Sequence, residues 1–394
     1  MIAHPSKPLL PADADSFGRE LDAVRERVLA DLGQRDVDHI RGVVRLVRYG
    51  DVAGRALLHA GVDPLTFALG VAMLGGAKIL ENMEIGHNVM HGQYDWTGDP
   101  ELDSQRYEWD MVADEDHWRR SHNAEHHVFT NILGRDRDIG YTFLRVSAAQ
   151  PWHPLHVFQP AAAVALALLF QWGIALHDVH LDESLAGRQS FAALRRRAAP
   201  VLRKAGWQLA KDYLVFPAVA LWNAPRVALG NLLANGVRNL WAFAIIFCGH
   251  FPEGVRLYDP EQTRDERRGD WYLRQLHGSA NITARRAFHV LSGHLSYQIE
   301  HHLFPDLPAA RYPEIAAQVQ EICARYGQAY NTGRFSAQFA SVARLLVRNA
   351  FPAVAPRWFT RSVARVLLRA RPPGRARAHA PAVTAPAEAS AASA

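Results

Sequence analysis

The chain is poor in cysteine and lacks the patterns of several large protein classes. Its 394 residues include only two cysteines, Cys248 and Cys323, too few for a disulfide framework or a four-cysteine zinc site. Residues 1–18 contain proline and aspartate where a secretory signal peptide has its apolar core, so we expect no signal and a cytoplasmic N-terminus. Zinc-finger spacing, an RNA-binding aromatic signature and a groove-reading helix are also missing, which argues against nucleic acid as a partner.

Long apolar runs are few, and polar segments separate them. The hydrophobic and charged fractions, 49% and 21%, are average for a globular protein, so only local patterns can indicate a membrane. The apolar stretches cover residues 52–80, 155–176, 212–226 and 228–249. The first is broken at Gly61–Pro64 and can form a hairpin that crosses a bilayer, although a buried soluble helix is the alternative. The last two are separated by the turn-like string Asn223–Arg226.

Histidine, by contrast, is abundant, and seven of the twenty histidines lie in three clusters. The clusters are His87–His91, His122–His127 and Gln298–His302. On an α-helix, a four-residue spacing places His87 with His91, and His122 with His126, on one face. The next residue, His127, then points about 100° away. Adjacent pairs therefore let one imidazole serve each of two neighbouring metal ions.

The number and type of ligands favour two metal ions with open positions. Imidazole suits zinc, copper, nickel and iron, but a structural zinc ion is closed by four ligands. Seven buried imidazoles without partners would also carry a desolvation cost. Glu300 and Glu125 are expected either to receive imidazole N–H groups, to bridge the metals, or to be plain surface acids. These observations predict a redox or hydrolytic two-metal site.

The clusters resemble the three histidine boxes of membrane fatty acid desaturases, which have the forms H-x3/4-H, H-x2/3-H-H and H/Q-x2-H-H. The string Gln298-Ile-Glu-His-His-Leu-Phe-Pro305 is similar to the branch that includes front-end and linoleoyl-CoA-type enzymes. Segments Asn82–Gln93 and Trp271–Gln275 resemble bacterial acyl-CoA desaturases of that branch. The resemblance covers roughly residues 40–335.

The resemblance implies an all-α integral membrane fold with about four transmembrane helices and a cytosolic helical cap that holds a di-iron site. It implies a reaction in which O2 and two external electrons introduce a cis double bond into a fatty acyl chain, carried as acyl-CoA or acyl-lipid. The cytochrome b5 string H-P-G-G is missing, since His4-Pro5 continues as Ser-Lys. A separate donor, a ferredoxin or an iron–sulfur reductase, is therefore expected. The implied location is a bacterial inner membrane, with the active site on the cytosolic side.

The resemblance also supplies a ligand set for the two iron ions. His250 is included because stearoyl-CoA desaturases carry a ligand histidine at the end of their last membrane helix. Gln298 replaces a histidine and is expected to be a weak or indirect ligand. His294, four residues earlier, is an alternative. The predicted metal ligands are His87, His91, His122, His126, His127, His250, His301 and His302.

The clusters must share one side of the membrane, so the chain crosses an even number of times between His127 and His301. We favour a hairpin that starts near Trp207 and ends at 249, which leaves residues 155–176 embedded or re-entrant. The basic segment Arg195–Lys204 then stays cytosolic.

The predicted division of the chain is a cytosolic segment at 1–50, a desaturase domain at 51–335, basic amphipathic helices at 336–371 and a disordered tail at 372–394. Two functions remain as alternatives. One is a di-iron hydroxylase or ketolase of lipids or carotenoids, against which the Gln298–Pro305 string argues. The other is a non-enzymatic metal-binding membrane protein, against which the completeness of the three boxes argues.

Overall fold

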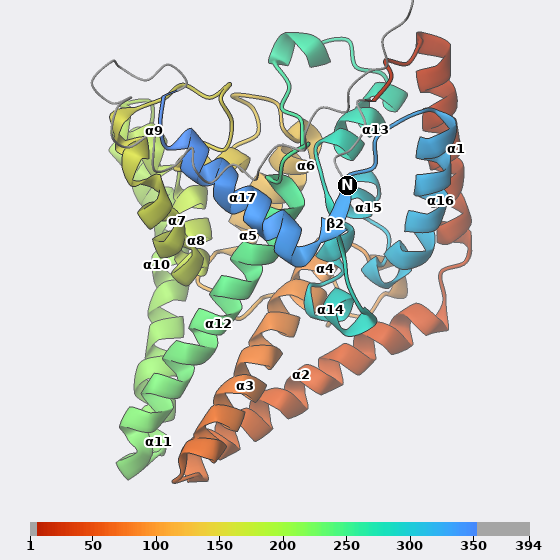
Figure 1. The fold of residues 1–394 in the computed structure, drawn as a ribbon. Helices are drawn as coiled ribbons and strands as arrows, with labels where there is room; N and C mark the ends of the chain where they lie inside the picture. The colour runs from red at the N-terminus through yellow and green to blue at the C-terminus, as the bar shows by residue number, and fades with distance from the viewer. Residues whose placement is uncertain (1–5, 353–394) are drawn as a thin grey trace, which may run out of the picture. The chain divides into compact units, whose positions relative to one another are not determined.

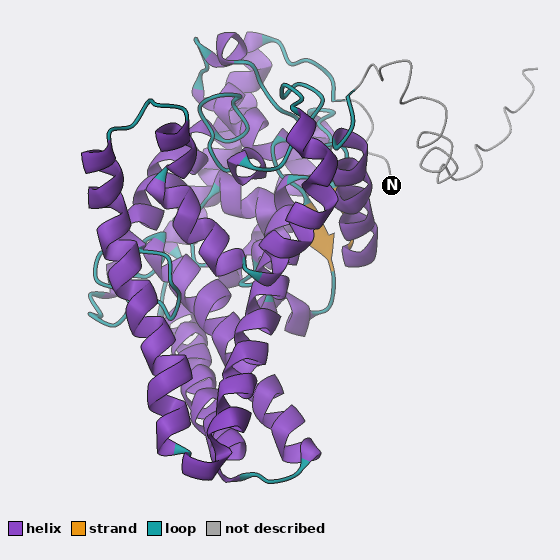
Figure 2. Ribbon diagram, turned by 90° about the vertical axis from the view of Figure 1, so that its left-hand side faces the viewer, coloured by secondary structure: helices purple, strands orange, loops and turns teal. Residues whose placement is uncertain are grey.

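The computed structural model describes residues 6–352, and this part of the chain is predominantly helical, which confirms the predicted helical class (Figure 2). The only strands in the described part are β1 (Asn281–Thr283) and β2 (Thr332–Arg334), which pair in parallel. Residues 353–394 lie outside the described residues. The predicted basic helix around Arg357, Arg361, Arg365 and Arg369, and the tail at 372–394, therefore stay predictions.

Two long helical hairpins dominate the architecture. The first joins α2 (Gln34–Ala60) to α3 (Pro64–Leu80). The side chain of Asp63 ends the turn by accepting hydrogen bonds from the backbone N–H groups of Leu65 and Thr66, as an N-cap residue does. The helices pack closely at Gly54, where a Cβ atom would lie 2.8 Å from the nitrogen of Leu74.

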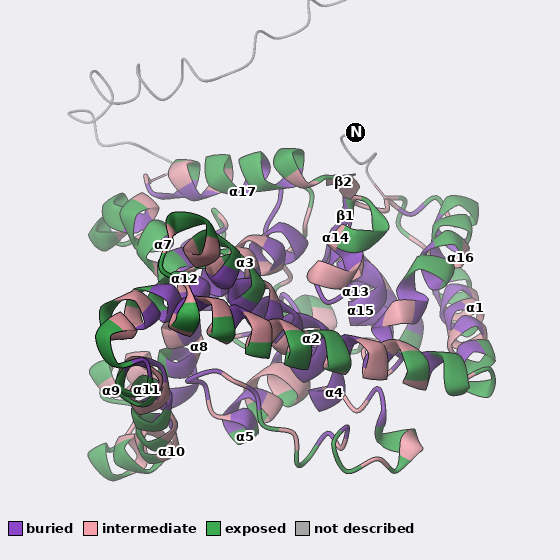
Figure 3. Cartoon of the chain, turned by 90° about the horizontal axis from the view of Figure 1, so that it is seen from below, coloured by how far each residue is buried: buried purple, intermediate pink, exposed green. Residues whose placement is uncertain are grey.

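The second hairpin runs from α10 (Phe191–Ala210) through η6 (Lys211–Val215) and α11 (Phe216–Val219), and returns along α12 (Ala224–His250). Figure 1 shows that both hairpins turn at the same end of the described part of the chain, called the unit below. The short helix η7 (Leu221–Asn223) makes the second turn. Residues at this end expose large apolar side chains, and Figure 3 views the unit from this end. The most exposed are Val62, Leu65, Leu214, Val219, Leu221 and Trp222.

Two helical segments among the described residues are long and apolar enough to cross a membrane, namely Pro64–Met90 and Leu221–His250. A third candidate is the pair formed by α7 (Gln159–Leu168) and α8 (Phe170–Val179), which follows η5 (Pro154–Phe158). This pair is bent by 102°, and in Figure 1 it stays in the upper half, away from the hairpin turns. By composition, two or three segments therefore qualify as membrane spans, and the unit has the exposed apolar surface of a membrane protein.

The remaining helices gather at the other end of the hairpins. The helices α1 (Pro11–Ala30), α13 (Arg268–His277), α15 (Gln298–Leu303) and α16 (Tyr312–Arg325) share a hydrophobic core that includes Phe17, Tyr272 and Phe304. The other helices of the described part are short, apart from α17. They are α4 (His87–Met90), α5 (Glu115–Trp118), α6 (His127–Phe129), α9 (Leu181–Leu185), α14 (Arg286–Leu291) and α17 (Phe335–Asn349).

Candidate metal centre

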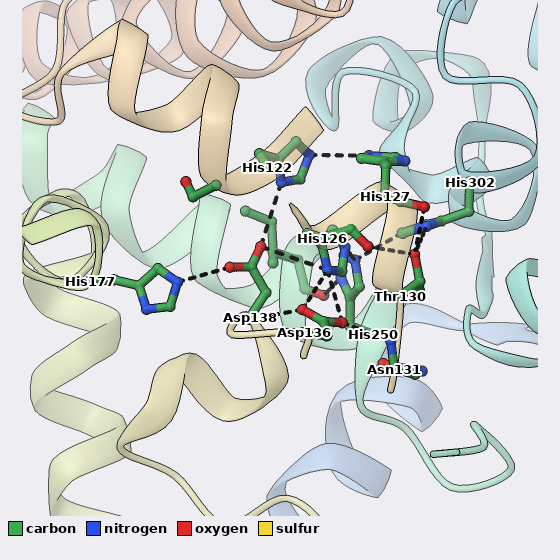
Figure 4. A network of polar contacts seen from close by, with 12 residues as sticks. His122, His126, His127, Thr130, Asn131, Asp136, Asp138, His177, His250 and His302 are labelled. Atoms are coloured by element: carbon green, nitrogen blue, oxygen red, sulfur yellow. Dashed lines mark hydrogen bonds and ion pairs between the residues drawn. The ribbon is translucent and has the colours of Figure 1, made fainter. Parts of the chain in front are cut away.

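Four separate segments bring all eight predicted histidine ligands together. His87, His91, His122 and His301 form a first group, and His126, His250 and His302 form a second group. Within each group the possible ligand atoms lie within 4.8 Å of one another. His127 adjoins the first group, because its Nε2 atom lies 3.3 Å from the Nε2 atom of His122. Figure 4 shows His122 and His127 facing each other, with His126, His250 and His302 beside them.

The adjacent pairs divide between the groups as the sequence analysis expected, but the second cluster does not follow α-helical geometry. Residues Arg119–His126 form a π-helix, η3, whose hydrogen bonds span five residues rather than four. His122 therefore meets His127, five residues on, and the Nε2 atom of His126 turns to the second group. The α-helical geometry assumed for this cluster therefore does not hold, although the rings of His122 and His126 still stack 5.2 Å apart and both lie beside Asp138. A further π-helix, η1 (Glu81–Gly86), precedes His87.

Each imidazole of the second group is held by its Nδ1 atom. The Nδ1–H group of His126 donates to Asp136 at 3.0 and 3.1 Å. That of His250 donates to the carbonyl of Ile246 at 2.8 Å, and that of His302 donates to Gln275 at 3.1 Å. With Nδ1 as donor, a neutral imidazole presents a lone pair at Nε2. All three lone pairs therefore face the centre of the group.

The spacing of these Nε2 atoms fits a metal ion between them. The Nε2 atom of His250 lies 3.1 Å from those of His126 and His302. Ligand nitrogens about 2.1 Å from a metal, at angles of roughly 90–109°, lie about 3.0–3.4 Å apart. Two lone pairs that face each other at this distance repel, so either a shared proton or a metal cation lies between the nitrogens. The donor set therefore fits a bound metal ion.

The first group shows the same need for a cation. The Nε2 atoms of His87 and His122 lie 3.3 Å apart. The Nε2 atoms of His91 and His301 are buried and have no hydrogen-bond partner among residues 6–352. A buried polar atom without a partner costs about 1–3 kcal/mol, and two such nitrogens lie here beside the facing pair of His87 and His122. Metal coordination would satisfy all of them at once.

Two carboxylates that sequence reasoning missed complete the centre. Asp136 also accepts hydrogen bonds from the backbone N–H groups of Asn131 (2.7 Å) and Asp138 (2.9 Å). Asp138 lies 3.5 Å from Nδ1 of His122 and 3.0 Å from Nε2 of His177, as Figure 4 shows. In the sequence the two aspartates lie in the string Arg135-Asp-Arg-Asp138, and no histidine spacing indicates that they belong to the site.

These carboxylates favour positive charge at the histidines. Burial lowers the pKa of His126, but the nearby charges of Asp136 and Asp138 outweigh burial and raise that pKa to about 9. The same negative charges that attract a proton attract a metal cation.

The sequence left the roles of four residues open, and the structure places them differently. They are Gln298, His294, Glu300 and Glu125. Gln298 reaches the second group, with its Nε2 atom 3.4 Å from Nε2 of His250. Gly249 makes this possible, because a Cβ atom there would lie 2.8 Å from the Gln298 side chain. His294 instead contacts Glu84 at 2.9 Å and belongs to neither group.

Neither glutamate makes a hydrogen bond or ion pair with a predicted histidine ligand of the described part. Glu300 accepts hydrogen bonds from Asn281 and Tyr330, because its side chain leaves α15 on a different face from His301 and His302. Glu125 is half-buried on η3 and makes no hydrogen bond or ion pair with a histidine of the described part. The side chains that contact ligand imidazoles include Asp136, Asp138, Gln275 and Tyr312.

Comparison with known proteins identifies the family of the chain. A family model described as fatty acid desaturase matches residues 63–334. The chain belongs to the fatty acid desaturase family. This desaturase is 43% identical over 348 residues to an NADPH-dependent stearoyl-CoA 9-desaturase of Mycobacterium tuberculosis, a match that covers 87% of this chain and 82% of the relative. The predicted family is thereby confirmed, and the protein is an oxidoreductase.

More distant relatives of the desaturase act on lipid-bound chains, according to their names. An sn-1 linoleoyl-lipid 6-desaturase of Synechocystis sp. is 25% identical over 285 residues, covering 71% of this chain and 79% of the relative. An acyl-lipid (8-3)-desaturase of Physcomitrium patens is 29% identical over 262 residues, covering 63% and 53%.

Proposed function

We propose that this desaturase introduces a cis double bond between C9 and C10 of a saturated fatty acyl-CoA of stearoyl length. The observation that carries the proposal is the pair of adjacent histidine groups, whose lone pairs converge at 3.1–3.3 Å. The carrier and the position of the bond rest on the mycobacterial relative named as a stearoyl-CoA 9-desaturase.

The reaction balances as R–CH2–CH2–R′ plus O2, two electrons and two protons, giving R–CH=CH–R′ and two waters. Two iron ions, when bound, supply the activation of dioxygen and the removal of hydrogen from the two carbons. The first group and His127 are proposed to hold one iron ion. His126, His250 and His302 are proposed to hold the other, with Gln298 as an indirect ligand. Most of the proposed ligands are imidazoles, which suit iron. Each set of three or more ligands also leaves coordination positions open on its iron ion.

The surrounding residues keep this ligand set in place. Asp136 and Gln275 fix the ring orientation of His126 and His302, so each Nε2 atom is directed inward and can coordinate a metal ion that displaces any proton there. Asp138 lies between His122 and His126 and joins the environments of the two groups. Its position lets one negative charge serve both metal ions.

We propose four spanning helices, made by α2, α3, the α10–α11 segment and α12. Near the turn, the charge of Arg55 on α2 is paired: Arg55 contacts Asp51 at 2.9 Å and lies 3.7 Å from the ring centre of Phe216. The bent α7–α8 pair then enters the membrane without crossing it. Because the basic start of α10 lies on the histidine side of its hairpin, the positive-inside tendency supports a cytosolic active site in a bacterial inner membrane.

The two electrons are proposed to come from a separate protein, because the sequence lacks the cytochrome b5 string. The NADPH dependence in the name of the mycobacterial relative favours an iron–sulfur reductase that oxidises NADPH, and a ferredoxin is the alternative. Under the same proposal, residues 51–335 form the desaturase domain, and the cytosolic N-terminal segment, predicted as residues 1–50, ends earlier within α2, because a spanning α2 needs more than its residues 51–60.

The test is expression together with such a reductase in a bacterial host, followed by gas chromatography of fatty acid methyl esters. A new Δ9 monounsaturated acid is expected. An oxygenated product would instead indicate a hydroxylase. An unchanged profile, with the protein present in the membrane and the reductase active, would contradict catalysis.

A further inference from the structure

Another group of side chains of the kinds that ligate metal ions lies outside the eight predicted histidine ligands. His39 on α2, Glu84 on η1 and His294 in the turn before η9 (Leu295–Tyr297) bring their side chains together. The Nε2 atom of His39 lies 2.6 Å from one carboxylate oxygen of Glu84. The Nδ1 atom of His294 lies 2.9 and 3.1 Å from the two carboxylate oxygens. All possible ligand atoms fall within 4.8 Å of one another.

The carboxylate at the centre is buried without a permanent cation. The side chain of Glu84 is only 1% exposed and that of His294 is 5% exposed. Among residues 6–352, no lysine or arginine forms an ion pair with Glu84, and its contacts of this kind are the two imidazoles alone. A buried carboxylate without a lysine or arginine partner needs positive charge from another source. The cluster therefore has a place for positive charge.

The backbone is shaped to bring these residues together. His294 has a positive φ of 54° and Gly293 one of 67°, a conformation that residues other than glycine and asparagine seldom adopt. A Cβ atom at Gly293 would lie 2.2 Å from the carbonyl oxygen of Met83, so only glycine lets this turn press against η1. The side chain of Asn88 donates to the carbonyls of both Glu84 and Gly293 and ties the two segments together.

We propose that His39, Glu84 and His294 bind a third metal ion, a divalent transition-metal ion of the zinc or ferrous type. Two imidazoles and one carboxylate form a donor set that suits these ions and leaves positions for water. The side chain of His39 is 23% exposed, so an ion can reach the site from solvent. The ion links α2 to the segment that leads into the third histidine cluster, and it is separate from the two ions of the proposed function.

The test counts metal ions in the full-length protein, purified in detergent, by inductively coupled plasma mass spectrometry. Wild-type protein is expected to carry one more ion per chain than each of the variants His39→Ala, Glu84→Gln and His294→Ala. His289→Ala is the matched control, because His289 is a buried histidine that contacts Ser296 and the carbonyl of Ala284 and lies outside the cluster. This control is expected to keep the wild-type count.

Each outcome decides the proposal. Equal counts in wild type and all three variants overturn it and leave a hydrogen-bonded network in its place. An equal loss in His289→Ala also overturns it, because general destabilisation would then explain the loss. If Glu84→Gln does not fold, the metal count of His39→Ala decides the proposal, because the side chain of His39 is partly exposed. The readout is independent of the di-iron assignment, because His126→Ala is expected to lower the iron count while the ion at Glu84 stays bound.

Discussion

Replacing Asp136 by asparagine tests whether the buried carboxylate sets up the second histidine group. Asp136 accepts from His126 and from two backbone N–H groups. An asparagine amide offers only one oxygen, so in either orientation its NH2 group faces a backbone N–H. Loss of a partner of this kind lowers metal affinity by about 10–100-fold, which corresponds to about 1.4–2.7 kcal/mol. Competition from protons at His126 also weakens, so the lower half of this range is expected.

The assay is the rate and extent of iron loss to a chelator, measured on purified protein beside the yield of unsaturated acid. Asp95→Asn is the matched control, since Asp95 also accepts from a backbone N–H group, that of Ser104 at 2.8 Å, but contacts no imidazole. Both variants should lose some stability, and only Asp136→Asn should lose iron. Unchanged iron affinity in Asp136→Asn, alongside a destabilised control, would refute the role assigned to this carboxylate.

Three further results are expected. His126→Ala should abolish desaturation while the protein stays in the membrane fraction on immunoblotting; full activity in that variant would remove His126 from the ligand set. Dialysis against an iron chelator should reduce desaturation to background, and ferrous iron but not zinc should restore it, because zinc has no redox chemistry; activity in demonstrably iron-free protein would contradict the cofactor assignment. Gly249→Ala should lower the rate of desaturation by about 10–100-fold, because its Cβ would displace the Gln298 side chain and misplacement near reacting groups is costly. Gly236→Ala on the same helix, where a Cβ atom meets nothing within 4 Å, should retain activity, and equal activity in both variants would show that the position of Gln298 does not matter.

Much of the centre was predictable because ligand histidines leave a spacing in the sequence. The adjacent pairs His126–His127 and His301–His302 led to two metal ions, and the structure directs the members of each pair to different groups. Placing His250 depended on recognising that an apolar run ends there. Hydrophobic periodicity and family resemblance together were enough for these points.

The rest depended on tertiary structure that short sequence patterns do not encode. The π-helix η3 changes which imidazoles meet, and no residue type marks such a segment in advance. Asp136 and Asp138 follow the second cluster in a loop with no periodic pattern, so only the folded chain shows where they point. The run at 155–176 reads as one continuous segment, yet it bends by 102° between α7 and α8.

The distribution of the histidines along the chain also has a consequence for biosynthesis. His87 and His302 are about 200 residues apart, so at 5–20 residues per second the ribosome takes roughly 10–40 s to make the last ligand after the first. During this interval the nascent chain exposes an incomplete set of imidazoles, without His301 and His302 to close either group. Under the proposed di-iron assignment, both groups can therefore be filled completely only after His301 and His302 have been made.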